Sequence, residues 1–324
     1  MHRFTRRWAL LCLALLLVPT AAYAHGKRFG PWGAPVNLQT IPETHPDVNT
    51  PYLDGCPILS PDGLELYMAS DRPGGEGGLD IWVARRTSKH SAFGAPENLG
   101  KPINSAQDDF CPSPMRGNLL FFVSGRPGGC GGADIYVSRK EDGVYEAPLH
   151  INCSVNSAAG EASPYLLERK GRTWLYFSSD RPGGFAADVG VPDADIYVSE
   201  LGRFGFGPAE LAPGLNTASN DARPNLRHDG LEIVFDSNRL GTMGGPDIFA
   251  STRGHVTDAW DVPVNLGPTV NSTVNDTRAS LSWDGRTLAF GSNRPGGELS
   301  PAGTTSNDIY MSTRERGGNS EDDD

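Results

Sequence analysis

One segment occurs five times along this chain, and this repetition limits the folds that the chain can adopt. The first copy, residues 60–83, reads SPDGLELYMASDRPGGEGGLDIWV, and later copies begin near residues 113, 163, 223 and 278. Repeats of this size are typical of solenoids and propellers. An aspartate precedes the last apolar run of every copy; these are Asp80, Asp134, Asp195, Asp247 and Asp308, spaced by 54, 61, 52 and 61 residues.

The residue types within each copy favour strands over helices. Short apolar runs such as Leu119–Val123 and Leu231–Phe235 are bounded by Gly, Pro and Asp, and they lack a 3.6-residue period. In the first copy, CPILS, LELYMAS and DIWVARR predict three strands, with a turn at Pro-Asp-Gly between the first two. The pattern therefore indicates an all-β protein.

A fourth strand follows most copies and predicts how the fold closes. FGAPENL begins at Phe93, and related segments begin at Tyr145, Phe206 and Trp260; their proline suits an edge strand. No such segment follows the fifth copy, but WGAPVNL at 32–38 precedes the first. We therefore predict a five-bladed β-propeller of four-stranded antiparallel blades, closed by an N-terminal outer strand. The domain is expected over 25–316, with blades at about 50–99, 105–151, 157–211, 217–266 and 272–314 plus 32–38.

The N-terminus has the features of an export signal. Arg3, Arg6 and Arg7 precede an apolar run over residues 9–18, and Ala22-Tyr23-Ala24 is a small-residue cleavage site. We predict a signal peptide over 1–24 and a periplasmic or secreted mature chain. The apolar run is too short for a confident membrane span, so no membrane insertion is expected.

The charge balance is acidic and disfavours anionic partners. The formal charge is −11, and removal of three N-terminal arginines leaves 25 basic against 39 acidic residues, which is −14. This argues against nucleic acid and anionic membranes as partners. The end of the chain, 317–324, reads GGNSEDDD and predicts a disordered acidic tail. A monomer is expected.

Four cysteines remain after the predicted cleavage, and an even number in an exported protein favours disulfides. Three pairings are open. The predicted strand directions place Cys130 and Cys153 in one neighbourhood, so this pair is favoured. Cys56 and Cys111 occupy equivalent positions in adjacent blades and are the weaker second pair, since a bridge requires Cα atoms within about 7 Å.

The motifs SPDG, SDRPGG and DIYV, in this order and in several copies, resemble the WD-like propeller repeats of TolB and its relatives. The resemblance covers nearly all of the mature chain. It implies a propeller fold, an exported location and a binding role. TolB has six blades and an N-terminal α/β domain, whereas this chain has five copies, so TolB's partners are not implied.

A second repeated pattern places one acid near the start of each innermost strand. Each acid follows an asparagine by five residues, in segments such as VNTPYLD. These acids are candidate binding residues around the mouth of the central channel. The alternative is structural: each acid pairs with a repeated arginine, and we favour this because all five blades share the feature. The acids are Asp54, Asp109, Glu161, Asp221 and Asp276, and the arginines are Arg72, Arg126, Arg181, Arg239 and Arg294.

Departures from the repeat are better candidates for recognition, because loops that vary on a constant scaffold usually carry function. Two residues after the acid, Arg223 and Arg278 stand where the other copies have Cys56, Cys111 and Ser163. The varied loops add three further candidate binding residues. These are His45, Tyr52 and Phe185.

We expect an exported binding or scaffold protein that engages a protein or a cell-envelope glycan through this face. The alternative is a glycan-active hydrolase that uses Asp54, Asp109 and Glu161, because some five-bladed propeller glycosidases carry Asp, Asp and Glu in this order. No cofactor and no metal motif is predicted. This face carries twelve acids, which are the ten repeated acids with Asp71 and Asp180. Only seven arginines face them, the five repeated ones with Arg223 and Arg278, so calcium is the one candidate cation.

Overall fold

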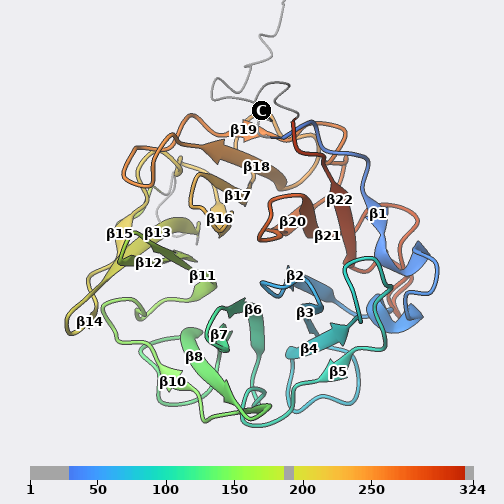
Figure 1. Ribbon diagram of the computed structural model, residues 1–324, viewed down its shortest axis with the longest axis horizontal. Coiled ribbons are helices and arrows are strands. Elements are labelled where there is room, and N and C mark those ends of the chain that lie inside the picture. The colour runs from blue at the N-terminus through green and yellow to red at the C-terminus, as the bar shows by residue number, and fades with distance from the viewer. Residues whose placement is uncertain (1–28, 186–192, 318–324) are drawn as a thin grey trace, which may run out of the picture.

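The computed structural model describes residues 29–185 and 193–317, and these form five antiparallel blades around a central channel (Figure 1). The prediction of an all-β, five-bladed propeller is confirmed. The predicted signal peptide, residues 186–192 of the third-blade insertion and residues 318–324 of the tail lie outside the described residues. Within the described ranges, no helix is both long and apolar enough to cross a bilayer.

Each blade begins with its innermost strand and proceeds outward (Figure 1). Blade 1 contains β2 (Asp54–Leu59), β3 (Glu65–Ser70), β4 (Asp80–Arg85) and β5 (Glu97–Asn98). Blade 2 contains β6 (Asp109–Met115), β7 (Leu119–Ser124), β8 (Asp134–Glu141), β9 (Val144–Tyr145) and β10 (Leu149–His150). Blade 3 contains β11 (Glu161–Arg169), β12 (Arg172–Ser179), β13 (Asp195–Gly202), β14 (Gly205–Phe206) and β15 (Glu210–Leu211). Blade 4 contains β16 (Asp221–Leu226), β17 (Glu232–Ser237), β18 (Asp247–Thr252) and β19 (Val264–Asn265).

Blade 5 joins the two ends of the chain. It contains β20 (Asp276–Leu281), β21 (Thr287–Ser292), β22 (Asp308–Thr313) and β1 (Val36–Asn37). Val36 lies opposite Met311, and Asn37 lies opposite Tyr310, so β1 covers the edge of β22. The predicted N-terminal closure is therefore confirmed. Two short 3-10 helices, η1 (Leu38–Thr40) and η2 (Pro46–Val48), follow β1.

The repeated motif packs blades 2 to 5 around one aromatic pair each, whereas blade 1 has Met68 opposite Trp82. In blades 2 to 5 a fully buried phenylalanine of the second strand stacks on an aromatic residue of the third strand, with ring centroids 6.0–6.2 Å apart. The repeated arginine lies over both rings; in blade 4, Arg239 is 5.1 Å from the ring centroids of Phe235 and Phe249. This contact explains why the motif couples Ser-Asp-Arg to Asp-Ile-aromatic, since a guanidinium over an aromatic face is stabilising.

The glycine-rich loops of blades 1, 2 and 4 pack closely against the crossover that leads into the next blade. A Cβ atom added at Gly131 would lie 2.2 Å from the Ser157 backbone oxygen, and one added at Gly244 would lie 2.2 Å from the Thr273 carbonyl carbon. Contacts this short cannot accommodate a side chain. These loops are therefore inter-blade packing elements and not phosphate-binding loops.

A bulge in every innermost strand sets the residues that line the channel. The register shifts after the second residue of the strand, and the third residue has a positive φ, between 48° and 59°. Bulges of this kind re-aim a side chain. The five bulged residues are Cys56, Cys111, Ser163, Arg223 and Arg278.

Candidate functional site

The five bulged residues line the narrow central channel, together with the residues that follow them. They are the positions at which the five blades differ most in chemistry: two thiols and a hydroxyl stand in blades 1 to 3, and two guanidinium groups in blades 4 and 5. The backbone conformation of the bulge is thus the same in all five blades, while the side chains that line the channel are neutral in blades 1 to 3 and cationic in blades 4 and 5.

The five acids at the starts of the innermost strands are fully buried. Each side chain has no exposed surface, and each forms an ion pair with the repeated arginine of its own blade. The Arg126 Nη2 atom is 2.9 Å from Asp109 Oδ1, and Arg181 Nη2 is 3.0 Å from Glu161 Oε1. Burial raises the pKa of Glu161, while hydrogen bonds from Ser157 and Ser179 oppose this. A ligand at the channel mouth does not contact Asp54, Asp109, Glu161, Asp221 or Asp276 in this arrangement.

The aspartates that precede the third strands are also structural. Backbone N–H groups of the glycine-rich loop donate to them; the Cys130 N–H donates to Asp134 Oδ2 at 2.6 Å and the Met243 N–H to Asp247 Oδ2 at 2.8 Å. Burial raises the pKa of Asp80, Asp195 and Asp247. These carboxylates order the loops and do not face the channel.

A different set of residues forms the rim, which we define as the residue before each strand-start acid and the residue after each second strand. The Leu53 N–H donates to Asp71 Oδ1 at 2.9 Å, and the Gly160 N–H donates to Asp180 Oδ1 at 2.8 Å. In blades 4 and 5, amide side chains accept the equivalent bonds. The rim residues are Leu53, Asp71, Asp108, Gly125, Gly160, Asp180, Asn220, Asn238, Asn275 and Asn293.

The rim has an acidic part and an amide part. Asp71, Asp108 and Asp180, in blades 1 to 3, are exposed, and none of them forms an ion pair with a residue of the described ranges. Sequence reasoning did not select them as site residues. The signal that could have identified them is variation at two repeat positions: the one just before the repeated acid, which is Asp108 in the second copy, and the one just after the second strand, which is Asp71 in the first copy and Asp180 in the third.

Next to the channel mouth, blades 4 and 5 form an open cavity of about 370 Å³, which we call the hollow. Its wall carries two guanidinium groups, several amides and two hydroxyls, and no carboxylate. It includes Arg223 and Arg278, whose role as binding residues stays a prediction. The lining residues are Asn220, Arg223, Pro246, Asn275, Thr277, Arg278, Asn293, Thr305 and Asn307.

The three loop residues proposed from sequence lie outside the lining of the hollow. His45 precedes η2, and its Nδ1 atom accepts the Asp47 N–H at 3.2 Å. Tyr52 is half-buried, and its N–H donates to Thr50 Oγ1 at 3.3 Å. Phe185 is 51% exposed, and its N–H donates to Asp195 Oδ2 at 2.7 Å. The His45 backbone N–H also donates to the Phe93 carbonyl oxygen at 2.8 Å, in the β4–β5 loop.

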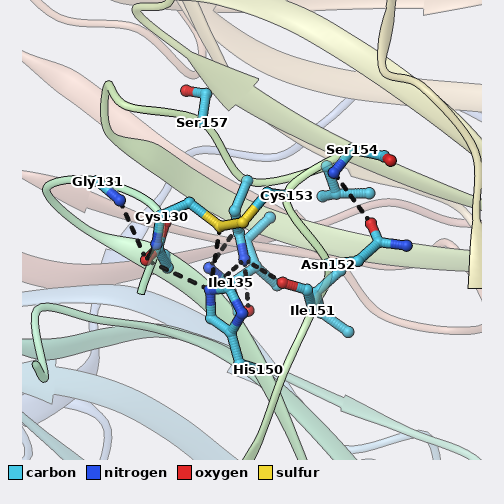
Figure 2. The surroundings of a disulfide bond; sticks show 12 residues. Cys130, Gly131, Ile135, His150, Ile151, Asn152, Cys153, Ser154 and Ser157 are labelled. Carbon is cyan, nitrogen blue, oxygen red and sulfur yellow. Dashed lines mark hydrogen bonds and ion pairs between the residues drawn. A yellow bond between two sulfur atoms is a disulfide. The ribbon is translucent and has the colours of Figure 1, made fainter. Parts of the chain in front are cut away.

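The favoured disulfide is confirmed. Cys130 and Cys153 are bonded, with Cα atoms 5.9 Å apart, and they tie the β7–β8 loop to the crossover that leads into blade 3 (Figure 2). His150 lies beside the bridge, with Nε2 3.4 Å from Asp134 Oδ2. Cys130, Asp134 and His150 are the only three described residues with the spacing of a metal site, but Cys130 has no thiolate to offer because its sulfur is in the disulfide. Calcium stays a prediction.

The second disulfide predicted from sequence is wrong, because Cys56 and Cys111 are two buried free thiols. Cys111 Sγ accepts a hydrogen bond from Ser163 Oγ at 3.2 Å. Hydrogen bonding from Cys56, with the charges of Arg278 and Arg223, lowers the pKa of Cys111 to about 6. The thiols are hydrogen-bonded partners in the channel wall instead of a covalent link between blades.

No protein-family model and no curated protein matches this chain. Several solved structures are similar to it. An α-L-arabinofuranosidase from Lactobacillus brevis is 12% identical, with a TM-score of 0.55 over 88% of this chain and 95% of that one. The catalytic domain of a Coprinopsis cinerea GH62 α-L-arabinofuranosidase is 11% identical, with a TM-score of 0.55 over 89% and 98%. A xylan β-1,4-xylosidase from Bacillus halodurans C-125 is 19% identical, with a TM-score of 0.51 over 85% and 55%.

At these identities the similarity establishes the propeller fold, and these three similar structures are glycosidases and not TolB-type proteins. The expectation of an exported binding or scaffold module is corrected, because these solved structures with the same fold are glycoside hydrolases. The five-bladed propeller implied by the repeat motifs is confirmed, while membership of the TolB family is not.

Proposed function

We propose that this protein hydrolyses glycosidic bonds of a glycan bound at the channel mouth. The observation that carries the proposal is the presence of three exposed carboxylates on the rim, at the same end of the propeller as an open polar hollow. Glycoside hydrolysis needs one carboxyl group to protonate the leaving oxygen and a second carboxylate to activate water or attack the sugar. The glycosidases that share the fold support the proposal.

The proposal assigns the acid and base roles to two of Asp71, Asp108 and Asp180. A catalytic carboxyl group must reach the bond that it cleaves. The rim carboxylates are exposed, whereas Asp54, Asp109 and Glu161 are enclosed and each bound to a guanidinium. We assign to that buried set the role of holding the innermost strands and the rim in place.

A location outside the cytoplasm fits this function. The Cys130–Cys153 disulfide supports it, because such bonds persist in oxidising compartments. We propose that residues 1–24 are the export signal, that the propeller spans 25–316 and that a cell-envelope or extracellular glycan is the substrate. The TolB-like repeat motifs are explained by blade packing, so we infer no TolB partner from them.

The test is release of reducing sugar from arabinan, arabinoxylan, pectin and peptidoglycan by the purified mature protein. We expect activity on at least one polymer. Asp71→Asn, Asp108→Asn and Asp180→Asn should be compared with Glu168→Gln, which changes an exposed acid near the other end of the innermost strand β11. At least two rim variants should lose roughly 10²-fold or more in kcat, the size of general acid–base catalysis, with unchanged Tm.

Two results would contradict the proposal. One is the absence of hydrolysis of all four polymers by folded protein. The other is full activity of all three rim variants, which would place the chemistry elsewhere. Glu161→Gln serves as a further comparison: we expect it to lower Tm, because it leaves Arg181 without its buried partner.

A further inference from the structure

The hollow has a charge opposite to that of the protein around it. The chain carries 39 acidic against 28 basic residues, yet the nine residues that line the hollow include two arginines and no carboxylate. The exposed acids of the rim belong to blades 1 to 3, and the hollow belongs to blades 4 and 5. The mouth is therefore divided into an acidic side and a cationic side.

One buried carboxylate positions both arginines. Asp236 has no exposed side-chain surface; its Oδ2 atom is 2.5 Å from Arg223 Nη1, and its Oδ1 atom accepts the Arg278 backbone N–H at 2.9 Å. The Arg223 guanidinium is thus fixed and partly neutralised. Arg278 forms no ion pair within the described part of the chain, and it lines both the hollow and the channel.

Cys111 lines the channel together with both arginines. The pKa of Cys111 is lowered in part by the charges of Arg278 and Arg223, which is the effect of a cation on a nearby acid. Asp236 offsets some of the charge of the two arginines. The net positive charge of the hollow is therefore small. An anionic ligand would be selected by direct hydrogen bonds to the Arg278 guanidinium.

The remaining wall suits sugar hydroxyl groups. The side-chain amides of Asn220, Asn275, Asn293 and Asn307 offer both donors and acceptors, and Thr277 and Thr305 add hydroxyls. Asn307 is held in place because its Nδ2 atom donates to the Asp54 carbonyl oxygen at 2.7 Å. A volume of about 370 Å³ lies within the range of small-ligand sites.

From this arrangement we propose that the hollow is a subsite for a negatively charged sugar, a uronic acid unit of the glycan, whose carboxylate is bound by Arg278. The inference rests on the proposed function, since it names the substrate class of the same mouth. A guanidinium binds a carboxylate with two parallel hydrogen bonds, which a neutral sugar cannot accept in the same way. The rest of the glycan would then extend toward the acidic rim.

The experiment measures binding to the full mature chain by isothermal titration calorimetry. The probes are tri-galacturonate, the neutral tri-galactose of equal length, and inorganic sulfate. We expect tri-galacturonate to bind at least 10-fold more tightly than tri-galactose. Arg278→Gln should weaken tri-galacturonate binding at least 10-fold and change tri-galactose binding less than 2-fold.

Three controls make the outcome specific. Arg278→Lys keeps the charge without the planar fork and should retain part of the preference. Arg203→Gln changes an exposed arginine of the β13–β14 hairpin and should change nothing. Tm is measured for every variant, and only variants with wild-type Tm are compared.

Equal affinity for the two trisaccharides, or an unchanged preference in Arg278→Gln, would overturn the inference. Binding of sulfate without binding of tri-galacturonate would also overturn it, because the hollow would then hold only small inorganic anions. The hydrolysis assay distinguishes an incorrect assignment of the uronic acid subsite from an incorrect assignment of the hydrolase function. Cleavage of a neutral polymer without uronate preference contradicts only the subsite, and uronate preference without cleavage of any polymer contradicts only the hydrolase.

Discussion

At the scale of single residues, each repeated arginine performs three tasks at once. Arg239 pairs with the buried Asp221, lies over two aromatic rings, and donates to the Leu215 carbonyl oxygen at 2.6 Å. A carboxylate and a guanidinium so enclosed depend on each other, because either one alone would be a buried, unpaired charge. The structural interpretation of the repeated acids follows from these contacts.

This dependence predicts non-additive losses of stability. Arg239→Gln, or Asp221→Asn, should each lower the free energy of unfolding by about 3–5 kcal/mol, as expected when one partner of a buried pair is removed. The double variant should lose less than the sum of the two, since no unpaired charge remains. Urea unfolding measures all three, and single losses below about 1 kcal/mol would contradict the buried-pair interpretation.

At the scale of elements, the blades are locked together by loops and not only by strand contacts. The β17–β18 loop meets the crossover that enters blade 5, where Gly244 lies against the backbone of Thr273 and Val274. The same arrangement recurs at Gly131, against Ser157 and Ala158. The second pair of glycines in the repeat is therefore required by contact between blades.

Gly244→Ala should destabilise the fold, because the new Cβ would collide with backbone atoms that cannot move independently of blade 5. A loss of about 1–3 kcal/mol is expected for overpacking of this kind. Gly125→Ala is the matched control: its nearest added contact is 3.6 Å, so we expect little change. Differential scanning calorimetry tests the pair, and equal Tm values for the two variants would contradict the packing argument.

At the scale of the whole molecule, stability depends on closing the ring. Strand β1 is brought from the N-terminus to the last blade, and the Asn37 side chain donates to Asp308 Oδ2 at 2.8 Å. Gly33 adds a backbone hydrogen bond to the Thr313 carbonyl oxygen at 2.8 Å. Without these contacts, the edge of β22 would be exposed to pairing with other chains.

Deletion of residues 29–39 should therefore lower Tm and broaden the unfolding transition, because blade 5 loses its outer strand and the ring its closure. The aggregation state should be followed by light scattering, since an open edge favours association. Thermal unfolding followed by circular dichroism provides the measurement. A truncated protein with the Tm and cooperativity of the full mature chain would show that closure contributes little.

The sequence by itself determined the number of blades, the closing strand and the Cys130–Cys153 bridge. The reason is physical: each blade is built from local strand and turn patterns, and those patterns recur in order, so counting them yields the architecture. The recurrence of one acid and one arginine in every copy also predicted that they pair, because a feature present in all five blades stabilises the blade structure that they have in common.

Only the tertiary structure decided which polar groups are accessible. Asp108 and Asp109 are neighbours in sequence, yet Asp108 is exposed and Asp109 has no exposed side-chain surface. That difference arises because successive side chains at the start of a strand point in opposite directions: Asp109 points into the blade toward Arg126, and Asp108 points to solvent. The free state of Cys56 and Cys111, and the separation of the mouth into acidic and cationic sides, likewise depend on how the bulges of five blades meet at one axis.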